Sequence, residues 1–163
     1  MSEQSSTRVK HPEVKIDQKT YLRIPIKTHV VMREDHLLDV IKKYVDNQLM
    51  PDDVLFVTEK IVAITQGRAI PLKDIKPRPL ATKLSKYVTK TPAGIVLGMP
   101  ETMEMALREC GIPRILLAAA ASAVTKVFGK KGVFYAVAGY KATSIDGPTA
   151  NTLPPYNQYV VLD

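Results

Sequence analysis

The chain has 163 residues and a formal net charge of +7, and its length suffices for one domain with a buried core. Its single cysteine, Cys110, excludes an internal disulfide and cannot form a zinc site alone, which is typical of a reducing compartment. The first residues are polar without the apolar core of a secretory signal, and no stretch reaches the about 20 apolar residues that a bilayer span requires. We therefore expect a flexible leader at 1–20, a single domain at 21–163, a cytoplasmic location and no membrane partner.

The first part of the domain predicts a strand, a helix and a second strand. Apolar and other residues alternate over 22–26, the pattern of a half-buried strand, although Pro25 favours a sheet edge. From Asp35 to Leu49 the apolar residues fall on one helical face, and Asp35 is the expected N-terminal cap. A turn containing proline ends that helix, and the apolar run Val54–Val57 predicts a central strand.

The second part predicts mostly helices, followed by strands. The apolar run 61–64, closed by Gly67, is compatible with helix or strand. Glycines and prolines at favourable positions bound the later helices. The expected elements are a short basic helix near 80–88, helices at 101–110 and 113–128, and strands at 133–138 and 159–162. The predicted fold class is therefore α/β or α+β, with a mixed sheet and helices packed on it.

A basic segment lies between Arg68 and Lys90. It contains seven lysines and arginines against Asp74 alone, which gives a net charge of +6. A field of one sign attracts anions such as nucleotides or phosphorylated ligands, whereas the alternative is a solvated face that aids solubility. Only Tyr87 is interleaved among these charges, and this argues against nucleic acid as the partner because single-strand binders add several stacking aromatics.

The segment Asp52–Arg68 combines an acidic turn, an apolar run, the polar break Thr58-Glu59-Lys60 and a second apolar run closed by Gly-Arg. Ile24–Thr28 precedes it, and a basic segment rich in proline follows it. In this order and spacing the chain resembles the amino-terminal part of the coenzyme F-420 gamma-glutamyl ligase family, over about Tyr21 to Leu162. The resemblance implies a ligase domain of the α/β class.

The resemblance also implies a reaction and its cofactors. Enzymes of that family use GTP and a divalent metal, magnesium or manganese, to activate a small-molecule carboxylate as an acyl phosphate, which the amine of glutamate attacks. If a helix begins at Thr58, its free N–H groups and Lys60 would face a phosphate. Arg68 is a further expected nucleotide contact. The alternative for Lys60 is a solvated lysine at the end of a strand.

A second segment resembles the family less closely. Val137-Ala138-Gly139 and the later Leu153-Pro154-Pro155 are similar to a family stretch whose Asn-Ala-Gly-Ile-Asp sequence supplies a metal-ligating aspartate. Asp146 is therefore the candidate metal ligand, and an Asx-type turn is its alternative role. No catalytic residue is assigned. The chain departs from the family in an additional apolar helix near 115–128 and in stopping at Asp163, so we expect an incomplete active site.

Three functions remain open from the sequence. The first is a GTP- and metal-dependent amide ligase domain that joins a carboxylate to glutamate. The second is a non-catalytic module that binds a nucleotide, a phosphorylated ligand or nucleic acid through residues 68–90. The third is a scaffold that forms a homodimer through the apolar strand 159–162.

Overall fold

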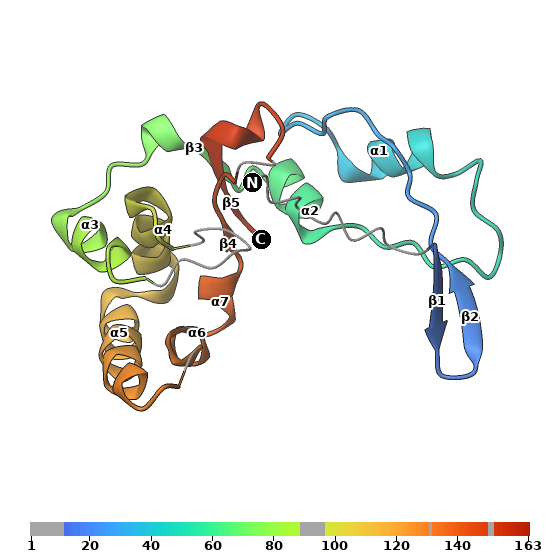
Figure 1. Cartoon of the computed structure of the whole chain (residues 1–163). Helices are drawn as coiled ribbons and strands as arrows, with labels where there is room; N and C mark the ends of the chain where they lie inside the picture. Colours follow the sequence, from blue (N-terminus) through green and yellow to red (C-terminus); the bar gives the residue numbers. More distant parts are fainter. Residues whose placement is uncertain (1–11, 89–96, 131, 150–151) are drawn as a thin grey trace, which may run out of the picture.

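A computed structural model describes residues 12–88, 97–130, 132–149 and 152–163 (Figure 1). Helices accompany two small antiparallel sheets, which confirms the predicted mixed α/β class. The strands are β1 Glu13–Ile16, β2 Lys19–Leu22, β3 Ala69–Pro71, β4 Ile145–Asp146 and β5 Tyr159–Leu162. The helices are α1 Leu37–Tyr44, α2 Glu59–Thr65, α3 Pro79–Ser85, α4 Pro100–Cys110, α5 Ile112–Val127, α6 Val133–Ala138 and α7 Tyr140–Thr143, with 3-10 helices at Leu72–Asp74 and Tyr156–Gln158.

Strand β5 is the centre of the larger sheet, whose order is β3-β5-β4. Ile70 pairs with Val160, and Asp146 pairs with Val161, both in antiparallel register. Side chains alternate between the two faces of a strand. Val160 and Leu162 accordingly belong to one apolar core, and Val161 belongs to another. Burial on both faces explains why the β5 sequence is continuously apolar, and the predicted strand 159–162 is confirmed.

The larger core lies on the side of the sheet that α3 to α7 cover (Figure 1). Met103, Ala106 and Leu107 of α4 are buried there, and α4 contacts α3, α5 and α7. Ala118 of α5 is fully buried in the same core, and α5 packs on α6. The predicted helices at 101–110 and 113–128 are confirmed as α4 and α5, and the helix predicted near 80–88 is confirmed as α3, which ends at Ser85.

The smaller core lies on the opposite face and contains Val40 of α1, Ala63 and Ile64 of α2, and Val161. Val31 also belongs to it, although residues 23–36 contain no strand. The hairpin of β1 and β2 stands apart from both cores (Figure 1). It occupies part of the segment predicted to be a flexible leader, whose residues 1–11 lie outside the described residues.

Both strands predicted in the first part of the domain are wrong. Residues 22–26 contribute only Leu22 to a strand, and the apolar run Val54–Val57 is not in a strand. A central strand requires hydrogen-bonded neighbours at both edges, and the described residues supply none for either segment. Ile24 is 66% exposed and Phe56 is 88% exposed, so these apolar patterns reflect no burial in the structure.

Other predictions change in detail. Residues 133–138 form α6 instead of a strand, because Gly132 and Gly139, both with positive φ, bound a turn of helix that packs on α5. The apolar run 61–64, which was compatible with helix or strand, lies in helix α2. Asp35 does not cap α1: its N-cap is His36, and the Asp35 carboxylate accepts a hydrogen bond from the Met32 N–H at 2.7 Å.

Candidate functional site

Helix α2 begins at the polar break of the sequence. Thr58 is its N-cap, and the Thr58 hydroxyl oxygen accepts a hydrogen bond from the Ile61 N–H at 3.4 Å. This bond satisfies one of the N–H groups that have no partner within the helix. The helix therefore starts where the sequence placed a possible start, and it positions Glu59 and Lys60 on its first turn.

Lys60 and Asp146 form an ion pair that joins the first turn of α2 to β4. The two side chains are partly exposed, at 40% for Lys60 and 34% for Asp146. The sequence assigned these residues separately, Lys60 to a nucleotide and Asp146 to a metal. The structure brings them together because β4 pairs with β5, and β5 packs against α2.

Glu59 contacts a third segment of the chain. The Tyr140 hydroxyl, at the start of α7, donates to the Glu59 carboxylate at 3.0 and 3.1 Å from its two oxygens. No role was predicted for Tyr140 from the sequence. Tyr140 directly follows Gly139, where the backbone changes direction. This position was the signal in the sequence for a role of Tyr140.

Arg68 lies at the edge of the sheet next to this group. Its backbone is fixed, because its N–H donates to the Ala63 carbonyl at 2.8 Å and its carbonyl accepts from the Leu162 N–H at 3.1 Å. Its guanidinium makes a long ion pair of 3.9 Å with Glu109. A half-exposed guanidinium with so long a pairing distance can reach a bound anion.

Asp163 follows β5 and was not predicted as a site residue. Its N–H donates to the Ser144 carbonyl at 2.7 Å, and its Oδ1 is buried without a hydrogen-bond partner among the described residues. Burial raises the pKa of the Asp163 carboxyl, and the nearby Asp146 carboxylate raises it further. An acidic residue directly after a buried strand was the available signal in the sequence.

Two hollows adjoin these side chains, and Arg68, Leu162 and Asp163 line both. The first has a volume of about 180 Å³ and extends to Val57 and Glu59. The second has a volume of about 250 Å³ and extends to residues of α4 and α7, namely Glu109, Tyr140 and Lys141. Lys60 and Asp146 line neither hollow, but both interact electrostatically with Asp163, as Arg68 does, so the three predicted residues lie around Asp163.

The charges of this region nearly balance. Lys60, Arg68 and Lys141 supply three positive charges, and Glu59, Glu109, Asp146 and Asp163 supply four carboxylates. A single phosphate would therefore meet carboxylates as well as cations. The arrangement suits a polar ligand that carries both charges, such as an amino acid, at least as well as an isolated anion.

In the basic segment 68–90, which the sequence predicted to attract anions, Arg78 has a different role. Arg78 is committed to the protein: its guanidinium donates to both oxygens of Glu104 at 2.9 to 3.2 Å, and its backbone N–H donates to one of them at 3.1 Å. The described lysines of the segment are exposed, and Lys90 lies outside the described residues. Arg78 therefore serves the core instead of an anion.

A sequence model of the F420-0:gamma-glutamyl ligase family matches residues 25–162, most of the chain. The chain belongs to this family. The resemblance that the Asp52–Arg68 segment indicated is thereby confirmed. No curated protein and no solved structure matches the chain.

A metal ion in this F420-0:gamma-glutamyl ligase family member would require several acidic, histidine or cysteine side chains close together around Asp146. The parts of the chain that the structure describes contain no group of three or more His, Cys, Asp or Glu side chains that could hold an ion. A hard cation takes six or more oxygen ligands, and the Asp146 carboxylate faces an ammonium instead of further oxygens. The described residues of this ligase-family chain do not by themselves fit a metal centre.

Within the same described ranges, no single helix is long and apolar enough to cross a membrane. Helices α4 and α5 reach that length and composition only as a pair bent by 117°.

Proposed function

We propose that this chain takes part in forming an amide bond between a small-molecule carboxylate and the amine of glutamate, with GTP as the source of phosphoryl activation. The Lys60–Asp146 ion pair, which lies around Asp163 together with Arg68, carries the proposal, and Arg68 and Asp163 line the two hollows. Family membership supports ligase chemistry as the class of reaction. The cytoplasm is the proposed location.

The proposed reaction has two steps. An oxygen of the substrate carboxylate attacks the γ-phosphorus of GTP, and GDP leaves with the electron pair of the broken bond. The glutamate nitrogen then attacks the carbonyl carbon of the acyl phosphate, inorganic phosphate leaves, and a proton passes from the nitrogen to a base. Covalent activation of this kind divides one difficult step into two easier ones.

The chain offers residues for both sides of this reaction. Lys60 and Arg68 are the proposed contacts to phosphate oxygens, and Thr58 holds the helix turn that carries Lys60. Asp163 is the proposed acceptor of the amine proton, because the raised pKa of its carboxyl makes it a stronger base than an ordinary aspartate. Its neighbour Asp146 would attract the ammonium form of glutamate.

Calorimetric titration with GTP and magnesium tests the nucleotide side. We expect Lys60→Ala and Arg68→Ala each to weaken binding by about 10- to 100-fold, since each removes a hydrogen bond to a charged group. Lys42→Ala is the matched control, because Lys42 is an exposed lysine of α1 outside this region, and it should leave the affinity unchanged. Equal affinities in all three variants would contradict the assignment of Lys60 and Arg68.

The competing function is a phosphate- or nucleic-acid-binding module that uses the exposed lysines of α3. Lys83→Ala and Lys86→Ala distinguish it, since both side chains are exposed on or next to that helix. Binding of GTP or RNA that depends on these lysines and falls steeply with salt would favour the module over the ligase.

A further inference from the structure

The hairpin of β1 and β2 belongs to neither apolar core, and Figure 1 shows it projecting from the rest of the molecule. All of its strand residues except Val14 are exposed. A two-stranded hairpin is only marginally stable in water by itself, whereas three or more strands can form a stable sheet. The hairpin also precedes residues 25–162, which match the ligase family. It is therefore a feature outside the family region, and its edges are free to pair.

The outer edge of β1 presents backbone groups that β2 does not use. The Arg23 N–H donates to the Pro12 carbonyl at 2.7 Å, so these two residues face each other as a hydrogen-bonded pair. Hydrogen-bonded and non-hydrogen-bonded pairs alternate along an antiparallel ladder. In the register of this hairpin Glu13 and Lys15 fall at non-hydrogen-bonded positions. Their N–H and C=O groups therefore point away from β2, and no other described segment bonds to them.

The side chains of the same two residues carry opposite charges. Glu13 and Lys15 are exposed and lie on one face of the hairpin, because side chains alternate along a strand. Within the part of the chain that the structure describes, neither takes part in an ion pair. Val14 lies on the opposite face together with Ile16, which is 55% exposed. A Glu-Val-Lys strand is complementary to an antiparallel copy of itself.

We propose that β1 pairs with β1 of a second copy of the chain about a two-fold axis, which joins the two hairpins into one antiparallel sheet. With Val14 facing the partner's Val14, Glu13 of each copy faces the partner's Lys15. In this register Glu13 and Lys15 occupy hydrogen-bonded positions, so their outward backbone groups pair across the interface. The same register forms two cross-strand ion pairs. Backbone and side-chain complementarity thus coincide in one arrangement.

Charge selects this register and this edge. A two-fold axis at Glu13 or at Lys15 would place identical charges directly opposite each other, which destabilises a sheet. Strand β2 contains no acidic residue, so two copies of its outer edge cannot pair opposite charges. Strand β5, which the sequence suggested as the edge of a homodimer, already has a strand on each side. The outer edge of β1 is therefore the edge that fits a second copy.

Sedimentation equilibrium of the full chain at concentrations up to about 1 mM tests the proposal. One strand from each copy buries less surface than a standard interface of about 1,600 Å², so we expect a monomer–dimer equilibrium in the micromolar range. Glu13→Lys and Lys15→Glu should each weaken association by about tenfold, since each replaces two ion pairs with two like-charge contacts. The variant that carries both changes should restore association, because the two charges are exchanged but remain opposite.

Lys19→Glu is the matched control, because Lys19 is an exposed lysine of β2, away from the outer edge of β1. It should leave association unchanged. Circular dichroism establishes that every variant is folded. A chain that stays monomeric at about 1 mM would overturn the proposal. A dimer that Glu13→Lys leaves equally stable would overturn it as well, since another surface would then hold the two copies.

Disulfide cross-linking tests the register directly. Cys110 is the single cysteine, and Cys110→Ser supplies a background without thiols. Val14→Cys in this background should form an intermolecular disulfide on mild oxidation, because residues at a non-hydrogen-bonded pair have closely spaced side chains. Thr20→Cys, at an exposed position of β2, should not. Equal cross-linking at both positions would contradict the pairing of β1 with its copy.

Discussion

At the scale of single residues, Glu104 is a buried carboxylate on α4, the helix that contributes Met103 and Leu107 to the larger core. Its side chain is 1% exposed, and Arg78 of the loop before α3 and Arg108 of α4 both donate to it. Burial raises the pKa of the Glu104 carboxyl, but the hydrogen bonds from the two arginines outweigh burial and hold it below its ordinary value. A buried charge is tolerated here because it is paired and hydrogen-bonded.

Arg78→Ala should lower the free energy of unfolding by about 1.5 to 3 kcal/mol, since it removes charge-assisted hydrogen bonds to a buried acceptor. Urea denaturation measures the change. Lys83→Ala, an exposed lysine of α3, is the control and should change it by less than about 0.5 kcal/mol. An equal effect of both variants would show that the Arg78 contact contributes nothing.

The pH dependence of stability follows from the same residue. Because the folded pKa of Glu104 is below its unfolded value, its stabilising contribution is complete above the unfolded pKa and is lost as the pH falls through the folded pKa. We expect the unmodified chain to lose stability below about pH 4, and Glu104→Gln to show a flatter acid limb. Denaturation midpoints at several pH values measure this difference.

At the scale of elements, Gly139 decides where two helices meet. It ends α6 and precedes α7 with φ 87° and ψ 179°, a region that only glycine adopts readily. A Cβ atom at this position would also lie 2.6 Å from a guanidinium nitrogen of Arg114. This turn also positions Tyr140 against Glu59, so the candidate functional site depends on the backbone conformation of Gly139.

Gly139→Ala should therefore lower the free energy of unfolding by about 1 to 3 kcal/mol. Gly129→Ala is the comparison, because Gly129 also has a positive φ but nothing lies within 4 Å of its added Cβ. We expect a cost of about 1 kcal/mol there. If Gly129→Ala proved the more destabilising of the two, the conformation assigned to Gly139 would be wrong.

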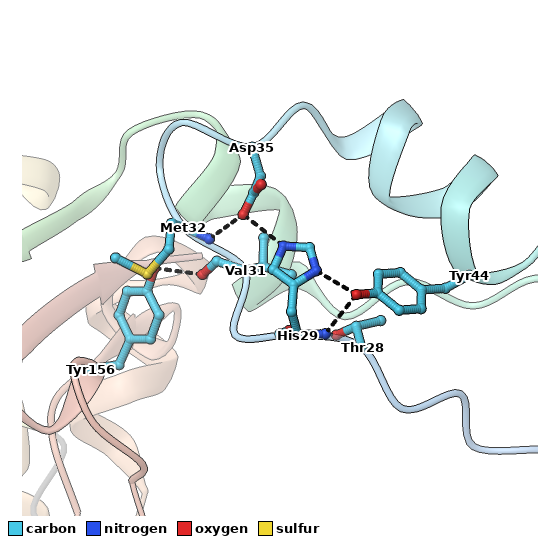
Figure 2. Close-up of polar contacts among 7 residues, drawn as sticks. All are labelled: Thr28, His29, Val31, Met32, Asp35, Tyr44 and Tyr156. Atoms are coloured by element: carbon cyan, nitrogen blue, oxygen red, sulfur yellow. Dashed lines mark hydrogen bonds and ion pairs between the residues drawn. The ribbon is translucent and has the colours of Figure 1, made fainter.

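At the scale of the whole molecule, a small set of polar contacts joins the N-terminal segment to the sheet region (Figure 2). The Tyr156 hydroxyl donates to the Val31 carbonyl at 2.7 Å. His29 lies between the Tyr44 hydroxyl at 2.9 Å and the Asp35 carboxylate at 3.0 Å. These hydrogen bonds hold the irregular segment before α1 over the smaller core, because that segment contains no strand that could pair with the sheet.

Tyr156→Phe should loosen this segment without unfolding the domain. Loss of one hydrogen bond to a buried carbonyl corresponds to about 0.5 to 1.5 kcal/mol of local opening. Hydrogen exchange measured for residues 29–35 should become faster, while exchange in α4 stays the same. Tyr87→Phe, at an exposed tyrosine, should change neither. Unchanged exchange at 29–35 would show that Val31 is held by packing alone.

The sequence by itself determined the helices α3, α4 and α5, the strand β5 and the family, because these depend on local periodicity, on glycine and proline at helix ends and on the order of motifs. It also supplied Lys60, Arg68 and Asp146 as separate candidates. Only the tertiary structure decided that Lys60 pairs with Asp146 near Asp163, that Tyr140 donates to Glu59, and that Arg78 serves the core. Such contacts join residues far apart in the chain, and no local pattern encodes them. The apolar run 54–57 is not a strand for the same reason, since an apolar run becomes a strand only where another strand supplies its hydrogen bonds.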